Sequence, residues 1–421
     1  MKRVWTGVRF NRLESEWLNI IEKTQVSSVN MSRTRILLIP PDPLLLTASR
    51  GDEAMIISIT TYCKKIFSDP ELVIAVVDEK TDHLVRSLGA EPCPALNGKF
   101  SLKNTIELLL EKKITHCITI GADVCDGSYD PVFSARLIMI ADLMARNGIK
   151  SIVNGFSFSE KANPLMKKIF DNTAESVKFN LRDPVSYSRF KKFSTAGAQL
   201  TSDVAFLLKP EARENEKIEH LKVWIKSQKD NRAAVIGFNV HPLLLDLNDR
   251  SMLPTLISEV GFALKEIIEK DRVSLVLLEH DFRGTSADSI CFDPLEDFLR
   301  VHKCLNHVYR ATKPLSAAEI KAAVGNLDGV VSGRMHLAIA SLGMGVPIMA
   351  IGYKGKMEGL LKHFNLDKRL LVSGVLLVDK KSLLVSFRYF LNNIADIRRE
   401  VRENLEKVKT LAEKNLSSFA N

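Results

Sequence analysis

The sequence contains two series of alternating predicted strands and helices, and these two series restrict the possible folds more than any other feature. Continuous apolar runs are bounded by turn residues and separated by segments of helical periodicity. Such alternation is typical of parallel sheets covered by helices on both faces. The apolar runs lie at 35–41, 71–78, 114–123, 150–158, 233–240, 273–281, 307–311, 328–334 and 347–353. We therefore predict an α/β protein with two Rossmann-like lobes that face a cleft.

The two series of strands also predict where the domains begin and end. The chain should contain an N-terminal extension, a first lobe, a second lobe and a C-terminal amphipathic helix, at residues 1–33, 34–210, 211–380 and 381–421. In the extension, Trp17, Ile20 and Ile21 favour a short amphipathic helix that docks on its own protein rather than on a membrane. In the last segment, apolar residues recur at three- and four-residue steps, which predicts one long helix that packs back on the first lobe.

The composition and net charge restrict the kinds of molecule that the protein is expected to bind. Of the 421 residues, 46% are hydrophobic and 26% are charged, and 59 Lys and Arg against 50 Asp and Glu give a net charge of +9. A chain of this length and composition can bury a normal core. The positive charge favours an anionic partner or has no specific role. The charge is scattered, and zinc-finger spacing and RNA-binding aromatic motifs are missing, so we do not expect nucleic acid as a partner.

Cysteine spacing and hydropathy indicate a cytoplasmic protein. None of the six cysteines forms a Cys-x-x-Cys pair, and several lie in apolar runs, which predicts buried reduced thiols and no metal site. The N-terminal segment has no secretory apolar region, and no run of 18 apolar residues occurs. Peripheral membrane contact through the C-terminal helix remains open.

Polar residues follow the predicted strands of the first lobe, where ligands of parallel sheets bind. Asp52 opens the first helix and either contacts a ligand or complements the charge of the helix terminus. Asp123 and Asp126 follow the third strand and either bind sugar hydroxyls or cap the next helix. Asn154 ends the fourth strand and could line a cleft.

Other polar residues near strand ends allow two interpretations each. Arg182 stands beside Asp183 and forms either a surface salt bridge or a planar site for a carboxylate or phosphate. Similar positions in the second lobe are held by Asn239, His241, His280, Asp281 and Arg283. A histidine near a strand end is often only a satisfied structural residue.

A cation and an imidazole stand two residues apart where the strand at 328–334 ends. Arg334 and His336 lie there, and Lys356 follows the next strand. Neighbouring strands lie about 4.8 Å apart, so the two loops can converge. Two fixed cations with one group that transfers protons near neutral pH suit an anionic substrate that undergoes proton transfer. A structural Arg–His pair at a helix start is the alternative.

Several motifs together resemble the polysaccharide pyruvyl transferase family, from about residue 35 to residue 365. The segment Gly-Asp-Glu-Ala at 51–54 is similar to its first motif, and IGADVCDG, LRDPVS and TSDVAFLL occur in the family's order. The segment SGRMHLAIASLGMGVPIMAIGYKGKMEGLL at 332–361 contains Ser-x-Arg-x-His, Gly-Val-Pro and Tyr-x-x-Lys. The ordered set carries the resemblance.

The resemblance implies a fold similar to GT-B glycosyltransferases and a pyruvyltransferase that uses phosphoenolpyruvate. The pyruvate would become a ketal on two hydroxyls of one sugar in a cell-surface polysaccharide such as a bacterial exopolysaccharide or capsule. It assigns essential roles to His336 and Lys356. It implies that Arg334 and Arg182 hold the charges of the donor. From their positions near strand ends we also expect Ser332, Gly333 and Tyr353 to bind the donor. We expect Asp52, Asp123, Asp126 and Asn154 of the first lobe to bind the acceptor. No metal or cofactor beyond the co-substrate phosphoenolpyruvate is expected.

Two other functions fit the same pattern. The protein could be a GT-B glycosyltransferase that uses a sugar nucleotide, since a basic strand end also suits a diphosphate. It could instead be a non-catalytic glycan-binding member of the fold. Whether the acceptor is lipid-linked and whether the chain forms homo-oligomers are left open.

Overall fold

Two separate parallel sheets organise the chain in the computed structural model. The structure describes residues 2–23, 33–211, 216–245, 250–311, 313–352, 355–417 and 419. Unit 1 comprises Met1–Leu46, Met55–Val204 and Thr410–Asn421, and unit 2 comprises Thr47–Ala54 and Ala205–Lys409. Every helix among the described residues is too short or too polar to span a bilayer.

Unit 1 is built on a seven-stranded sheet with the order β3-β2-β1-β4-β5-β6-β7, and all of its pairings are parallel. Its strands are β1 (Arg35–Ile39), β2 (Glu71–Ala75), β3 (Glu91–Cys93), β4 (His116–Ile120), β5 (Lys150–Phe156), β6 (Lys178–Leu181) and β7 (Ala198–Leu200). The central strand β4 is buried along its whole length. This confirms that the mostly apolar run at 114–123 contains a covered parallel strand.

The helices of unit 1 are α1 (Lys2–Lys23), most of α2 (Arg50–Ile66), α3 (Asp82–Ser87), α4 (Leu102–Glu111), α5 (Pro131–Arg146), α6 (Leu165–Asn172) and α7 (Pro184–Phe193). Three of them, α4, α5 and α7, begin at a Ser or Asp side chain that caps the helix. Helix α5 shows the pattern: Asp130 accepts hydrogen bonds from the N–H groups of Val132 and Phe133, and Pro131 occupies the first turn. The helix then packs on β4 and β5.

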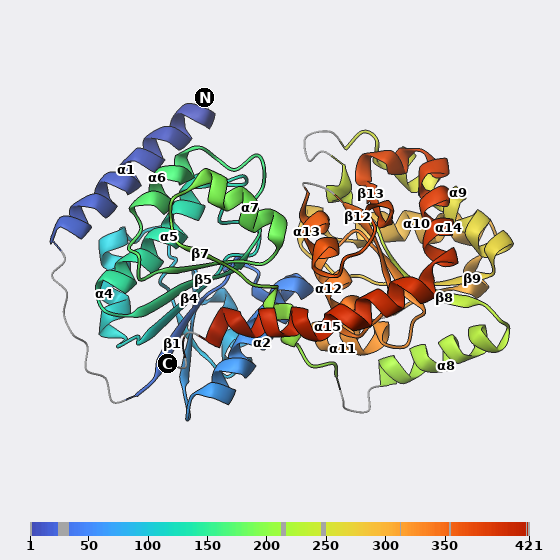
Figure 1. The fold of residues 1–421 in the computed structure, drawn as a ribbon, viewed down its shortest axis with the longest axis horizontal. Coiled ribbons are helices and arrows are strands. Elements are labelled where there is room, and N and C mark those ends of the chain that lie inside the picture. Colours follow the sequence, from blue (N-terminus) through green and yellow to red (C-terminus); the bar gives the residue numbers. More distant parts are fainter. Residues whose placement is uncertain are drawn as a thin grey trace. The chain divides into compact units, whose positions relative to one another are not determined.

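The N-terminal extension is a helix docked on unit 1. Helix α1, dark blue in Figure 1, packs against α4 and α5. Trp17 is fully buried, and its Nε1 donates to Oδ2 of Asp142 on α5 at 2.8 Å. Phe10 is buried in the same core. The prediction that this helix docks on its own protein is confirmed.

Unit 2 is built on a six-stranded parallel sheet with the order β10-β9-β8-β11-β12-β13. Its strands are β8 (Ala234–Asn239), β9 (Val273–Leu277), β10 (Val308–Arg310), β11 (Gly329–Ser332), β12 (Ile348–Gly352) and β13 (Leu371–Ser373). Its helices are α8 (Glu216–Asp230), α9 (Leu253–Asp271), α10 (Ser289–Val301), α11 (Ala317–Val324), α12 (Met335–Gly343), α13 (Lys356–His363), α14 (Lys380–Asn392) and the first part of α15 (Ile394–Ser417). Each sheet therefore forms an α/β unit of the predicted class.

The C-terminal segment differs from the single helix that we predicted. Helix α14 ends at Asn392, and α15 begins at Ile394. From Thr410 onward, α15 belongs to unit 1, where Asn415 Nδ2 donates to the Ser202 carbonyl at 2.6 Å. The chain thus does return to the first unit, although only through the end of its last helix.

The segment Thr47–Ala54 lies in unit 2, whereas the predicted boundaries placed it in the first lobe. Backbone contacts explain the difference. Ser49 forms an isolated antiparallel bridge with Asp281, and the Arg50 N–H donates to the His280 carbonyl at 2.9 Å. These contacts fix the first turn of α2 to the loop that follows β9. A prediction that divides the chain into consecutive segments cannot assign a short internal segment to a unit that is distant in sequence.

Candidate active site

The carboxyl ends of three neighbouring strands bring polar side chains together in unit 2. Strands β9, β8 and β11 are adjacent in the sheet, so the loops that follow them emerge at one edge. The first turn of α2 joins these loops through the backbone contacts described above. The candidate site is therefore built from three strand-end loops and one helix terminus of the same unit.

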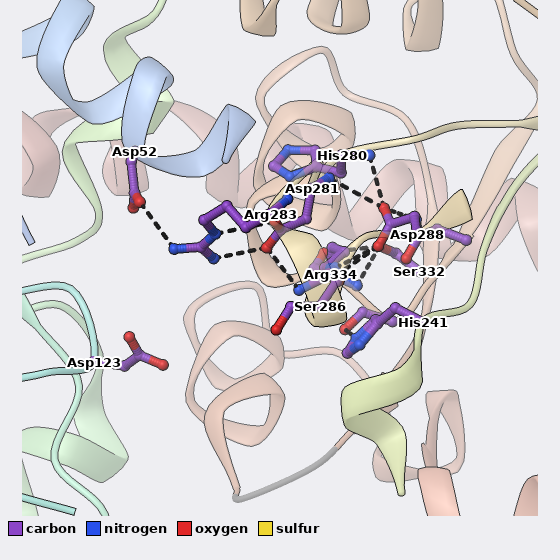
Figure 2. Close-up of polar contacts among 12 residues, drawn as sticks. Asp52, Asp123, His241, His280, Asp281, Arg283, Ser286, Asp288, Ser332 and Arg334 are labelled. Atoms are coloured by element: carbon purple, nitrogen blue, oxygen red, sulfur yellow. Dashed lines mark hydrogen bonds and ion pairs between the residues drawn. The ribbon is translucent and has the colours of Figure 1, made fainter. Parts of the chain in front are cut away.

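Arg334 lies at the centre of a buried ion-pair network (Figure 2). Its Nε and Nη2 donate to Oδ1 of Asp288 at 2.9 and 2.6 Å, and its Nη1 lies 3.1 Å from Oδ2 of Asp281. Arg283 donates to both carboxylate oxygens of Asp281 at 3.0 and 2.6 Å. Nη1 of Arg283 also lies 3.4 Å from Oδ2 of Asp52. The guanidinium of Arg334, a residue only 8% exposed, is thus held by protein carboxylates.

Asp288 anchors this network from a fully buried position. Its Oδ2 accepts the N–H of His280 at 2.7 Å and Nδ2 of Asn239 at 2.9 Å, while Oδ1 accepts Arg334. Burial raises the pKa of the Asp288 carboxyl, and the Arg334 charge opposes that rise. Because every one of these contacts comes from an N–H donor, the geometry is that of an ionised carboxylate.

Three histidines surround the network, and two of them are kept neutral. Burial, followed by the charge of Arg334, lowers the pKa of His241 well below its usual value. Burial, followed by the neighbouring His336, does the same to the pKa of His280. The rings of His280 and His336 are parallel, with centroids 6.4 Å apart and 6° between their planes. His336 is only partly buried, so it is the more accessible imidazole of the three.

His336 rests directly against the first turn of α2. A Cβ atom built on Gly51 would lie 2.2 Å from Nδ1 and 2.6 Å from Cγ of His336. Nonbonded heavy atoms do not approach so closely, so the observed position of the imidazole requires glycine at this point. The Gly-Asp-Glu-Ala segment therefore contributes the carboxylate of Asp52 and, at Gly51, the space that the imidazole of His336 occupies.

Ser332 and Gly333 shape the turn that leads from β11 into α12. The hydroxyl of Ser332 accepts the N–H of Arg334 at 3.1 Å and donates to the Arg334 carbonyl at 2.8 Å. A Cβ on Gly333 would lie 2.9 Å from Cδ2 of His241, whose Nε2 is 2.8 Å from the Gly333 carbonyl. Both residues thus fix the backbone from which Arg334 and His336 project.

Lys356 is the first residue of α13 and is partly exposed. It follows Gly355, whose φ of 71° is the left-handed conformation that glycine tolerates best. After burial and Arg334, the charge of Lys356 also contributes to the lowered pKa of His241. The predicted donor-binding residue Tyr353 lies outside the described residues. In the described part of the chain, no three His, Cys, Asp or Glu side chains are grouped as metal ligands.

Comparison with known proteins assigns the family. The family model for polysaccharide pyruvyl transferases matches residues 50–355, which is more than half of the chain. The chain belongs to the polysaccharide pyruvyl transferase family. It is therefore a polysaccharide-modifying transferase, and the matched region contains the whole ion-pair network together with Gly51 and His336. No curated protein sequence matches the chain.

The fold of this pyruvyl transferase family member is similar to that of GT-B glycosyltransferases and epimerases. A putative UDP-N-acetylglucosamine 2-epimerase from Listeria monocytogenes matches with a TM-score of 0.58 and 12% identity, over 92% of this chain and 96% of that one. A glycosyltransferase from Rickettsia africae matches with a TM-score of 0.58 and 12% identity, over 92% and 98%. The S. aureus MnaA–UDP co-structure matches with a TM-score of 0.56 and 10% identity, over 92% of this chain and 96% of that one. At these identities the likeness shows the fold.

Arg182, the predicted donor-binding residue of the first lobe, is an internal ion-pair partner within unit 1. Its Nη1 donates to Oδ2 of Asp203 at 2.8 Å, and its Nε donates to Oγ of Ser157 at 2.8 Å. Arg182 and Asp203 are both almost completely buried. This placement supports a structural role for Arg182, and its predicted contact with the donor stays a prediction.

The predicted acceptor-binding residues are divided between the two units. Asp52 belongs to unit 2 and pairs there with Arg283. In unit 1, Asp126 is buried and accepts the N–H groups of Ser128 and Ser159, whereas Asp123 accepts the Tyr129 hydroxyl at 3.0 Å. Asn154 is also buried in unit 1, and neither of its side-chain amide atoms has a partner among the described residues. Their roles in acceptor binding stay predictions.

Asp288 is the residue of this family member's site that the sequence analysis did not find. It directly precedes α10, where an Asp ordinarily indicates an N-cap. Here it makes no capping bond to that helix, and its carboxylate points back to the strand ends. The available signal was the nearby Glu-His-Asp segment at 279–281, which shows only that polar residues follow β9.

Proposed function

We propose that this chain transfers pyruvate from phosphoenolpyruvate onto two hydroxyls of one sugar, as a ketal, in the synthesis of a cell-surface polysaccharide. The observation that carries the proposal is the position of His336. The imidazole lies in the first turn of α12, rests against Gly51 and lies beside the anchored charge of Arg334, within the region matched by the family. A proton-transferring group next to fixed positive charge suits an anionic substrate.

In the proposed reaction, His336 donates a proton to the methylene carbon of phosphoenolpyruvate. The central carbon becomes electrophilic and is attacked by one sugar hydroxyl. The C–O bond to phosphate breaks, and a second hydroxyl of the same sugar closes the ketal. Phosphoenolpyruvate and the diol thus give the ketal and one inorganic phosphate, so the equation balances without another co-reactant. We accordingly propose no metal or cofactor for this step.

The donor's carboxylate and phosphate need positive partners, which we assign to Lys356, Arg334 and the amino-terminal end of α12. Helix N-termini favour anions because their N–H groups point outward. Asp288 holds Arg334 in one orientation, so its charge acts without reorganisation during the reaction. Ser332, Gly333 and Tyr353 stay predictions for the donor site. The proposed location is the bacterial cytoplasm, in keeping with six buried free cysteines.

The proposal is tested by incubating the protein with phosphoenolpyruvate and a panel of aryl and lipid-linked glycosides. We expect release of inorganic phosphate together with an acceptor mass gain equal to pyruvate minus one water. Phosphoenolpyruvate should also raise the melting temperature by mass action. Stabilisation by UDP-sugars but not by phosphoenolpyruvate, with no acceptor product, would contradict the proposal and favour a sugar-nucleotide glycosyltransferase.

Replacing Gly51 with alanine should impair the reaction by displacing His336. The added Cβ cannot share space with the imidazole, and a displacement of about 1 Å can cost on the order of 100-fold in rate. Steady-state kinetics with phosphoenolpyruvate measures the loss as a fall in kcat. The matched control is Gly7→Ala on α1, where a Cβ would meet nothing within 4 Å. Equal kcat values for the two variants would show that Gly51 does not position His336.

A further inference from the structure

Unit 2 contains a cavity beside the candidate site that the proposed chemistry does not use. Its volume is about 420 Å³, which lies in the range of small-molecule sites. It opens at the ends of β9 and β10. The lining residues are Leu277, Leu278, Glu279, Glu296, Arg310, Ala311, Lys313, Pro314 and Leu315.

The polar lining presents oriented hydrogen-bonding groups. Arg310 donates from Nε to Oε1 of Glu279 at 2.7 Å and from Nη1 to Oε2 of Glu296 at 3.1 Å. Among the described residues, both contacts of Glu279 with Arg310 use Oε1, and Oε2 accepts no hydrogen bond. Lys313 is exposed and makes no ion pair or hydrogen bond with the described residues. The cavity therefore offers one oriented acceptor and one exposed donor.

The charge and the apolar lining favour a neutral, hydroxyl-rich ligand. Two carboxylates, one guanidinium and one ammonium sum to zero, so the lining does not select an anion such as phosphate. Leu277, Leu278, Pro314 and Leu315 supply an apolar wall for the C–H face of a sugar ring. The lining contains no aromatic side chain on which a nucleobase would stack.

The cavity shares structural elements with the site around His336. Glu279 immediately precedes His280, whose ring lies parallel to that of His336. On the other side, the Leu315 carbonyl accepts Nε of Arg50 at 2.6 Å, and Arg50 adjoins Gly51. A ligand in the cavity would thus contact the loop that carries His280, and also Leu315, whose carbonyl is bound to the first turn of α2.

We propose that this cavity binds a neutral sugar residue through Glu279, Lys313 and the apolar wall. The proposal rests on the proposed function only in identifying that sugar as part of the acceptor glycan. It assigns acceptor recognition to unit 2, in addition to the residues predicted in unit 1.

The test measures glycoside binding without the reaction. The probes are the p-nitrophenyl glycosides of galactose, mannose and N-acetylglucosamine. Uridine represents the alternative class of ligand, a nucleoside. The binding of each probe is measured by calorimetry and saturation-transfer NMR. Ala311→Phe fills the cavity, and Glu279→Gln removes the acceptor charge. We expect each variant to weaken the binding of at least one glycoside about tenfold or more. Glu219→Gln on the exposed face of α8 is the matched control, for which binding should not change.

The outcomes separate this proposal from the proposed function. Retained stabilisation of Ala311→Phe by phosphoenolpyruvate, with loss of glycoside binding, supports both. Suppose that glycoside binding depends on Ala311 and Glu279, but phosphoenolpyruvate does not stabilise the wild type. This result would support the cavity proposal and contradict the proposed pyruvyl transfer. No binding of the three glycosides to the wild type, glycoside affinity unchanged in Ala311→Phe, or uridine binding in their place would overturn the cavity proposal.

Discussion

Alanine in place of His336 is expected to lower the rate of pyruvyl transfer by about 10²–10⁴-fold, the usual contribution of a general acid or base. The other two imidazoles near the network, His241 and His280, are poorly placed to supply the proton, because both are buried and burial lowers the pKa of each. Single-turnover measurements of phosphate release and ketal formation report the loss. The melting temperature should change little, since His336 is only partly buried.

The control for this variant is His220→Ala, which removes an exposed imidazole from α8 in the same unit. It should retain full activity. Phosphoenolpyruvate should still stabilise His336→Ala, because the proposed cationic partners Lys356 and Arg334 remain. If the purified variant transferred pyruvate at nearly the wild-type rate, His336 would not be the proton donor.

Alanine in place of Asp288 is expected to destabilise unit 2 by about 3–5 kcal/mol, the typical cost of removing one partner of a buried ion pair. Arg334 would keep its charge in a buried position, the N–H of His280 would lose its acceptor, and Asn239 would lose one of its two acceptors. Hydrogen exchange of the amides in β8 and β11 measures the opening free energy of the unit that contains the network.

Two further variants separate the ion pair from general packing. Asp297→Ala removes an exposed carboxylate that pairs with Arg300 on α10 and should cost less than about 1 kcal/mol. The double variant Asp288→Ala/Arg334→Met removes both charges and should recover a large part of the stability lost in Asp288→Ala. If the double variant were as unstable as the sum of the two single variants, the charge pairing would not explain the loss.

The long central strands could be predicted from the sequence, as could the short strand β10, whereas the short strands β3, β7 and β13 could not. Strands such as β4 and β9 are mostly apolar, fully buried runs of five residues that lie between clear helical segments. Strands β3, β7 and β13 contain only three residues each, which is too few for a periodicity to appear. Their pairing depends on neighbours in the sheet that are distant in sequence.

In the candidate site, sequence placed the residues but not their partners. Arg334 and His336 were located at a strand end because the apolar run stops there. That the guanidinium of Arg334 is held by Asp288 depends on a contact between two different loops, which no local pattern encodes. The same limit applies to Arg182, whose buried pairing with Asp203 cannot be distinguished from a ligand site by spacing alone.

The assignment of Thr47–Ala54 to unit 2 has a consequence for recombination between homologues. A chimaera joined once, between Val204 and Ala205, would take Gly51 and Asp52 from one parent and His336 and Arg283 from the other. The imidazole and the glycine that makes room for it would then come from different parents. An exchange of whole units in this family should therefore use four crossovers, at 46/47, 54/55, 204/205 and 409/410, so that the first turn of α2 is inherited with the sheet to which it is bound.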